Sequence, residues 1–207
     1  MKKTSLFIFT LFFSCIVSAA SIYKIELIAF SFPNKSKAPD NATNISLLNT
    51  SSAVKLTGQD DPSSDPNGYY KLLPNSSFTM SKQATAISNK SGYTILAHIA
   101  WLQPIGSSTN SSPIFISGGN LLSNSHYQLE GSLRFYKTRF ITMKTNLDYT
   151  QPNWYQQDDT STYFQAFNMK QTARMRSKEI HYLDSPYIGL LVKVMPYKAQ
   201  NTPNAMS

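Results

Sequence analysis

The side chains best suited to chemistry lie close together near the end of the chain. Glu179, His181 and Asp184 form a short ionisable run, with Tyr182 inside it. Carboxylates and histidines are the usual groups of general acid–base catalysis and of metal sites. This run has three interpretations: an active site, a binding surface, or the solvated end of a core strand.

The spacing gives little support to a metal or to a nucleophile. A metal site needs three or four converging ligands, and the other two histidines, His98 and His126, lack ligand-like spacing. No Gly-x-Ser-x-Gly motif and no Ser-x-x-Lys motif in a helical setting stands out. We predict no metal, no cofactor and no catalytic residue, and keep a hydrolase that uses His181 and Asp184 as an alternative.

A row of cations precedes this run. Side chains two positions apart share one face of a strand, about 7 Å from each other. Here the even positions carry Lys170, Arg174, Arg176 and Lys178, and the odd positions carry Phe167, Met169, Ala173 and Met175. Arginine pairs in a bidentate manner with carboxylate or phosphate. The row therefore predicts a surface for an anionic partner, and the alternative is a charged face that only keeps the protein soluble.

The candidate surface for an anionic partner can now be stated in full. It comprises Lys170, Arg174, Arg176, Lys178, Glu179, His181, Tyr182 and Asp184. Secondary candidates are Arg134 and Arg139, from a second group of cations on a neighbouring strand, and Trp101 and Gln103 near the end of an apolar strand. Trp101 is interpreted as a core residue or as a stacking platform for a sugar. Trp154, expected in an exposed turn, is a further stacking candidate.

The start of the chain is typical of a signal peptide. Lys2 and Lys3 precede an apolar stretch over residues 6–17, and Ser18, Ala19 and Ala20 supply the small residues of a cleavage site. We predict a signal peptide over residues 1–20, with cleavage after Ala20 and export to the periplasm. Removal lowers the formal net charge from +8 to +6 and removes the single cysteine. A modest positive charge suits an anionic envelope partner, and export excludes nucleic acid as a partner.

Hydrophobic periodicity predicts the main elements. Residues 22–32 and 93–104 are rich in β-branched and aromatic residues and predict strands. Residues 79–91 have apolar positions at helical spacing and predict a helix that ends at Gly92. Further strands are predicted over residues 129–136, 139–149, 163–175 and 187–195.

Two polar stretches predict long loops. Residues 33–66 lack periodicity and predict a flexible loop, and residues 105–128 predict another loop with a short strand at 114–116. The resulting fold class is α+β: a mostly antiparallel sheet with one or two helices on one face, and long polar loops. We predict one periplasmic domain over residues 21–199 and a frayed tail over residues 200–207.

Several segments resemble the CsiV family. The strongest are HIAWLQP, residues 98–104, and RMRSKEIHYLDSPYIGLLVKVMPY, residues 174–197. The segments IYKIELIAF, YYKLLP (69–74) and LEGSLRFYKTRFITMKTNL (129–147) occur in the family's order. The resemblance thus covers nearly the whole mature chain.

The resemblance implies a function. CsiV proteins are periplasmic proteins of Gram-negative bacteria, described as peptidoglycan-binding and involved in cell-shape integrity. It implies a non-catalytic accessory of cell-wall assembly with two partners: peptidoglycan, and an outer-membrane lipoprotein that activates a bifunctional penicillin-binding protein. The cationic row would suit the carboxylates of peptidoglycan stem peptides. An envelope scaffold that binds only protein remains an alternative.

The chain departs from the family pattern at two places. The family tends to have Asp-His-Pro where this chain has Asp184-Ser185-Pro186. It also tends to have Arg-Tyr-Leu-His where this chain has Arg139-Phe140-Ile141-Thr142. Two family histidines are therefore absent, which fits a binding or structural role better than catalysis.

Overall fold

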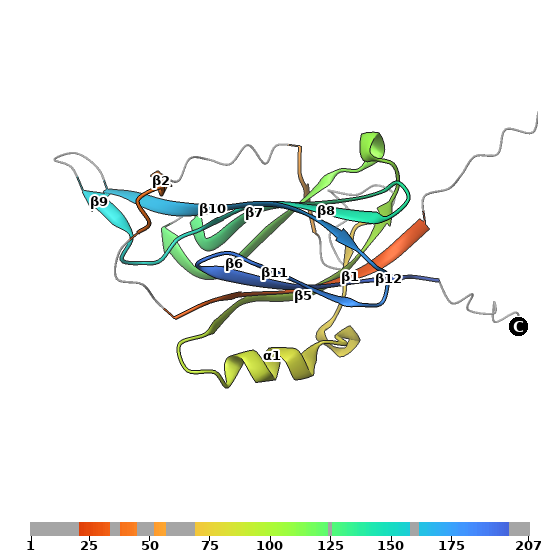
Figure 1. Cartoon of the computed structure of the whole chain (residues 1–207), viewed down its shortest axis with the longest axis horizontal. Coiled ribbons are helices and arrows are strands. Elements are labelled where there is room, and N and C mark those ends of the chain that lie inside the picture. The colour runs from red at the N-terminus through yellow and green to blue at the C-terminus, as the bar shows by residue number, and fades with distance from the viewer. Residues whose placement is uncertain are drawn as a thin grey trace, which may run out of the picture.

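The computed structural model describes residues 21–33, 38–44, 52–56, 69–123, 126–157 and 162–198. These residues form two stacked β-sheets, with a short helix beneath one of them (Figure 1). Residues 1–20 and 199–207 lie outside the described residues, so the signal peptide and the frayed tail stay predictions.

The five-stranded sheet has the order β11–β12–β1–β5–β4. Its strands are β1 (Ser21–Ser31), β4 (Lys71–Leu72), β5 (Thr94–Ile105), β11 (Ile180–Asp184) and β12 (Ile188–Pro196). All of its pairings are antiparallel. The strands predicted over residues 22–32, 93–104 and 187–195 are confirmed as β1, β5 and β12.

The seven-stranded sheet has the order β2–β10–β8–β7–β6–β3, and β9 pairs with β10. Its strands are β2 (Thr43–Asn44), β3 (Val54–Lys55), β6 (Pro113–Ser123), β7 (His126–Lys137), β8 (Ile141–Tyr149), β9 (Tyr155–Gln157) and β10 (Thr162–Met175). Among the described strands of this sheet, only the β3–β6 pairing is parallel. The mostly antiparallel arrangement is confirmed.

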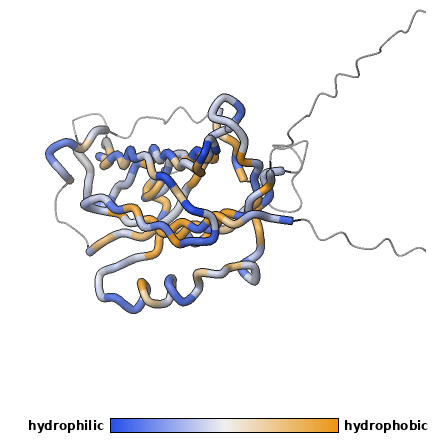
Figure 2. The backbone as a smooth tube through the Cα atoms, turned by 45° about the vertical axis from the view of Figure 1, so that its right-hand side comes forward, coloured by the Kyte–Doolittle hydropathy of each residue, from blue (hydrophilic) through white to orange (hydrophobic). Residues whose placement is uncertain are grey.

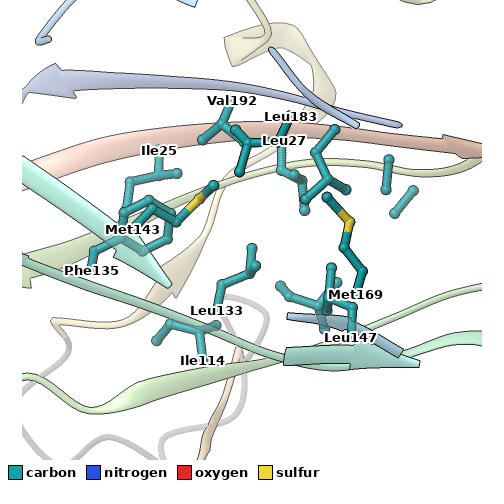
Figure 3. Packing of buried hydrophobic residues seen from close by; sticks show 14 of the residues in the cluster. Ile25, Leu27, Ile114, Leu133, Phe135, Met143, Leu147, Met169, Leu183 and Val192 are labelled. Atoms are coloured by element: carbon teal, nitrogen blue, oxygen red, sulfur yellow. The ribbon is translucent and has the colours of Figure 1, made fainter. Parts of the chain in front are cut away.

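The core fills the space between the two sheets. Alternate residues of β7, β8 and β10 point inward and meet alternate residues of β1, β11 and β12 (Figure 3). Leu27 and Val192 from one sheet and Leu133, Met143 and Met169 from the other are almost fully buried. Burying each such side chain stabilises the fold by roughly 1.5–3 kcal/mol. The apolar stretches of the chain follow this interior (Figure 2).

The prediction of one sheet with helices on one face is wrong in its layering. Two sheets cover each other, because both carry an apolar face that needs a partner. The described residues contain one α-helix, α1 (Ser81–Ser88), and short 3₁₀ turns at Asn75–Ser77 and Ser108–Asn110. The start of α1 packs on the outer face of the five-stranded sheet, where Met80 contacts a small cluster containing Ile28 and Phe30.

Both predicted loops contain more structure than expected. The short strand predicted at residues 114–116 is the eleven-residue β6. Within residues 33–66, the described stretches form β2 and β3, and the partly buried Ala38, Val54 and Leu56 pack against the core. The sequence did not indicate β2 and β3, because their surroundings are polar and each strand pairs over only two residues at a sheet edge.

Gly118 allows β6 to approach β5. A Cβ atom at this position would lie 2.4 Å from the carbonyl oxygen of Leu96, a residue of the other sheet. Any side chain there would push the two backbones apart, so the close approach of β6 to β5 requires a glycine here.

Candidate functional site

The outer face of β10 carries the first part of the cationic row. Lys170 and Arg174 are exposed, while the adjacent Met169 and Met175 are buried. This alternation follows from the strand geometry, because one face of β10 covers the core. The structure thus places Lys170 and Arg174 on one exposed face, as the sequence predicts.

The row ends earlier than predicted. β10 stops at Met175, and the chain then turns over residues 176–179 into β11 of the other sheet. Lys178 adopts a left-handed backbone conformation with φ of 72°, and its N–H donates to the carbonyl oxygen of Val194 at 2.8 Å. The expectation that Lys178 continues the row is therefore wrong, because it belongs to a turn between sheets and not to a strand.

The turn and the β7–β8 hairpin border an open cavity. Its volume is about 370 Å³, and it is lined by Phe140, Arg174, Met175, Arg176, Glu179 and His181; we call it the arginine cavity. Phe140 is 45% exposed at the hairpin tip. The guanidinium carbons of Arg139 and Arg174 lie 5.5 and 5.9 Å from the centre of its ring. Cation–π contacts of this kind position the two arginines beside the cavity.

The charges of the arginine cavity are poorly compensated. Arg176 Nη1 lies 4.0 Å from Glu179 Oε1, and these side chains are 79% and 56% exposed. Such an exposed pair contributes little to stability. Among the described residues, Arg174 has no carboxylate within ion-pair distance. Guanidinium donors therefore remain available for a carboxylate or phosphate of a ligand.

His181 lines the cavity and contacts the backbone of Arg176 in the turn that forms part of the cavity wall. Its Nε2 lies 2.9 Å from the backbone nitrogen of Arg176 and 3.1 Å from the carbonyl oxygen of the same residue. One imidazole nitrogen is thus used to hold the turn that presents Arg176.

Tyr182 and Asp184 do not belong to the arginine cavity. In β11 they alternate with His181 and Leu183, so they lie on the outer face of the five-stranded sheet while Leu183 enters the core. The predicted surface is therefore divided in two by β11. The His181–Asp184 pair of the hydrolase alternative is not assembled, because the two side chains leave opposite faces of the strand.

The secondary cations extend the basic surface over the seven-stranded sheet. Arg134 of β7 lies directly opposite Lys144 of β8, and Lys144 pairs in register with Thr172 of β10. Arg134 donates to Ser111 Oγ at 2.9 Å and to the Ser108 carbonyl oxygen at 2.6 Å. Like charges directly opposite each other destabilise a sheet, so this arrangement favours an anion near the outer face.

A second cavity borders the start of the β7–β8 hairpin. It has a volume of about 730 Å³, and Tyr69, Asn110, Lys137 and Thr138 are among its lining residues. The β7–β8 hairpin thus contributes residues to two cavities, and each cavity has a cation in its wall.

Trp101 and Gln103 cannot contact a partner. Their exposed fractions are 0% and 1%, and the Trp101 indole N–H donates to Gln103 Oε1 at 2.8 Å. The interpretation of Trp101 as a sugar platform is wrong, and its core interpretation is confirmed. Trp154 is also buried, at 1% exposed, with its ring edge-on to those of Tyr149 and Tyr187.

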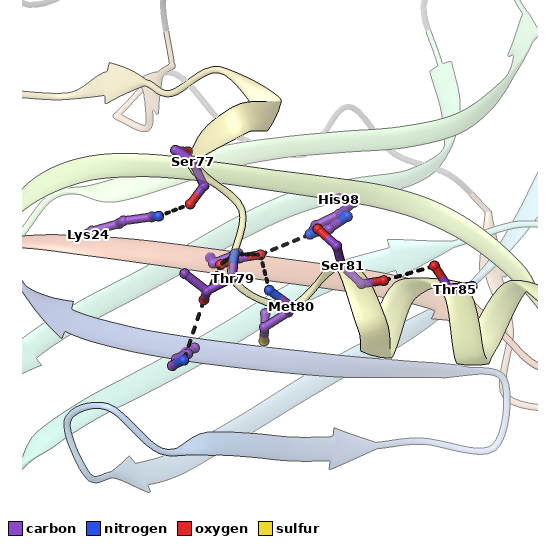
Figure 4. Close-up of polar contacts among 9 residues, drawn as sticks. Lys24, Ser77, Thr79, Met80, Ser81, Thr85 and His98 are labelled. Atoms are coloured by element: carbon purple, nitrogen blue, oxygen red, sulfur yellow. Dashed lines mark hydrogen bonds and ion pairs between the residues drawn. The ribbon is translucent and has the colours of Figure 1, made fainter.

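Sequence reasoning missed a buried carboxylate, Glu26. It is 0% exposed and accepts hydrogen bonds from the Thr79 and Met80 N–H groups and from the Thr79 hydroxyl, all between 2.7 and 3.0 Å. His98 Nε2 lies 3.0 Å from its Oε1, and Figure 4 shows His98, Thr79 and Met80 meeting at the start of α1. The available signal was a lone glutamate inside the apolar segment IYKIELIAF.

Glu26 anchors the start of α1. Met80, the residue before the helix, makes no side-chain cap, so the strand carboxylate accepts from the amides at this end. Burial acts to raise the pKa of Glu26, but the hydrogen bonds from His98, Thr79 and Met80 outweigh it and hold the pKa below its usual value. This polar cluster is structural.

Other possible sites are limited within the part of the chain that the structure describes. No group of three or more His, Cys, Asp or Glu side chains there is placed to hold a metal ion. In the same residues, no helix is long and apolar enough to cross a membrane.

The geometry thus defines a class: a two-sheet β-protein with an open cationic cavity built from a strand end, a turn and a hairpin. The family described as "Peptidoglycan-binding protein, CsiV" matches residues 2–197 of the chain. The chain therefore belongs to the CsiV family, which confirms the resemblance seen in the sequence. No curated protein and no solved structure matches it.

Proposed function

We propose that this protein is a non-catalytic accessory of cell-wall assembly that binds peptidoglycan through the arginine cavity, which takes a stem-peptide carboxylate. Membership of a peptidoglycan-binding family supports a binding role and an envelope location. The observation that carries the choice of site is the exposed pair Arg174 and Arg176, which meets only one distant carboxylate among the described residues. Arg174, Arg176 and Phe140 line the same cavity, so the guanidinium groups provide charge and the ring provides a flat contact surface for a carboxylate-bearing peptide.

Co-sedimentation with purified sacculi tests this proposal. The chain without residues 1–20 should sediment, and the variant Arg174→Gln/Arg176→Gln should be retained at least about tenfold more weakly, since each charged hydrogen bond contributes roughly 1.5–3 kcal/mol. Retention should also fall with rising salt, because the Debye length is about 8 Å at physiological ionic strength.

Two controls separate the site from general charge. The variant Lys82→Gln/Lys198→Gln removes the same charge from exposed positions elsewhere and should sediment like the wild type. Sacculi whose carboxylates have been amidated chemically should retain the wild type weakly. Equal retention of the arginine variant and the lysine control would contradict the assignment of the cavity, and failure of the wild type to sediment would contradict peptidoglycan binding.

The proposal extends to processing and to a protein partner. We propose export to the periplasm with cleavage after Ala20, on the basis of the sequence of residues 1–20. The resemblance supports a complex with an outer-membrane lipoprotein that activates a bifunctional penicillin-binding protein. Strand β11 is the last strand of its sheet, and such an edge can accept a strand from a partner.

Pull-down with that lipoprotein tests the partner. Capture of the lipoprotein without sedimentation on sacculi would favour the protein-only scaffold. Hydrolysis of a wall substrate that is lost in a folded His181→Ala variant would favour the hydrolase alternative.

A further inference from the structure

Aromatic side chains gather on the outer face of the five-stranded sheet, on the side of β11 away from the arginine cavity. Phe30 lies at the centre, with Phe32 edge-on at 5.7 Å, Tyr93 at 6.2 Å and Tyr182 parallel within 9° at 6.4 Å between ring centres. Phe32 and Tyr93 also pack edge-on at 5.7 Å. These four residues are called the aromatic platform below.

The platform has a buried floor and an accessible rim. Phe30 is 5% exposed, whereas Tyr182 is 54% exposed and Phe32 and Tyr93 are half-buried. Gly189 of β12 lies in register with Phe30 on one side and Asp184 on the other. A Cβ atom at Gly189 would lie 2.4 Å from the Phe30 ring, so only glycine lets this ring lie flat over β12 and extend toward Tyr182.

Polar groups of both signs surround the rings. Asp184 is exposed on the same face of β11 as Tyr182, and Lys90 Nζ lies 5.0 Å from the centre of the Tyr93 ring. Burial raises the pKa of Tyr182, and the nearby Asp184 and Tyr93 raise it further, which reflects how closely these groups approach. The rim thus offers two phenol hydroxyls, a carboxylate and an ammonium group, with no net charge.

This combination matches the surface of a sugar chain. Hexose rings present apolar C–H faces that stack on aromatic rings, and hydroxyl and amide groups that hydrogen-bond to the polar atoms beside them. A lipid would leave the polar rim unpaired, and the Asp184 carboxylate opposes the binding of an anion. The balanced charge contrasts with the arginine cavity, where cations predominate.

We infer that the aromatic platform is a second binding site, for a neutral chain of β-linked N-acetylated amino sugars. The inference rests in part on the proposed function, because the glycan strand of peptidoglycan is such a chain. The segment from Arg174 to Asp184 then serves two ligand groups: its first half presents guanidinium groups to a carboxylate, and Tyr182 and Asp184 bind the sugar backbone from the other side of β11.

Uncharged N-acetylglucosamine oligomers test this site separately from the arginine cavity. Titration of the chain without residues 1–20, followed by NMR or calorimetry, should show binding that changes little between low and high salt. The variant Tyr93→Ala/Tyr182→Ala should bind the oligomer roughly tenfold more weakly. The matched control Tyr127→Ala/Tyr197→Ala removes two tyrosines that are each 42% exposed elsewhere, and it should bind like the wild type. Unfolding curves establish that each variant is folded.

The outcomes distinguish the two proposals. The variant Arg174→Gln/Arg176→Gln should keep oligomer binding and be retained more weakly on sacculi. If the oligomer does not bind, or if the platform variant and the control variant bind it equally well, the sugar site is overturned. The proposal for the arginine cavity is then unaffected. Oligomer binding by a protein that fails to sediment on sacculi overturns the proposed function and leaves the sugar site standing.

Discussion

Two of the glutamate–histidine groups in the described residues differ in almost every physical respect. Glu26 is fully buried, accepts from two backbone amides and a hydroxyl, and lies 3.0 Å from His98. Glu179 is 56% exposed, reaches Arg176 only at 4.0 Å, and its neighbour His181 bonds instead to the backbone. The same residue types thus build a structural anchor in one place and an open surface in the other.

Burial and the number of donors decide between these roles. A buried carboxylate is tolerated only when hydrogen bonds replace its water, and each bond then constrains the surrounding elements. An exposed carboxylate keeps its water and leaves the nearby guanidinium groups free for a ligand. Variants that exchange or remove these features should therefore affect stability at one group and binding at the other.

The largest expected effect is on stability, at Glu26. Glu26→Ala leaves the amides at the start of α1 without their acceptor and should lower the free energy of unfolding by about 3 kcal/mol or more. The matched change Glu179→Ala should alter it by less than about 0.5 kcal/mol. Denaturant unfolding measures both, and similar losses would show that the contrast between the groups is wrong.

Acid should weaken the Glu26 anchor as well. The folded pKa of Glu26 is lowered, so its contribution is present above the unfolded pKa of about 4.3 and is lost as pH falls through the folded pKa. Wild type and Glu26→Gln should therefore differ in unfolding free energy near neutral pH and converge in acid. A difference that stays constant down to acidic pH would assign the stabilisation to packing and not to the ionised carboxylate.

An effect of intermediate size, on both stability and oligomer binding, is expected at Gly189. The new methyl group of Gly189→Ala meets the Phe30 ring, whose retreat is limited by Phe32 and Tyr93. Overpacking of this kind should cost about 1–3 kcal/mol of stability and weaken oligomer binding, with salt-sensitive retention on sacculi unchanged. Adding Phe30→Leu should recover part of the stability; no recovery would place the strain elsewhere.

The smallest effect is expected at Phe140. Phe140→Ala removes the ring between Arg139 and Arg174 but none of the charge, so retention on sacculi should fall by about fivefold or less. Phe140→Tyr should restore it. A loss as large as that of the double arginine variant would mean that the ring, and not the guanidinium groups, makes the main contact.

The strands could be predicted from the sequence because alternation is a local property. In β10 and β12 the apolar period follows the strand, and it correctly placed Lys170 and Arg174 outward. The prediction failed at Lys178 and at Tyr182, since alternation carries no information beyond the point where a strand ends. A turn of four residues moved the chain from one sheet to the other. Even-numbered positions still face outward in β11, but on the outer face of a different sheet.

The sequence by itself determined the residue types, the family and the run of cations, because these depend on identity and on spacing of a few residues. Only the tertiary structure decided that Phe140 at the tip of the β7–β8 hairpin contacts Arg174 of β10, and that Trp101 is buried in the core. It also decided that β11 separates the arginine cavity from the aromatic platform. The reason is physical: two apolar sheet faces must cover each other, and the packing that achieves this sets which distant residues meet and which remain in water.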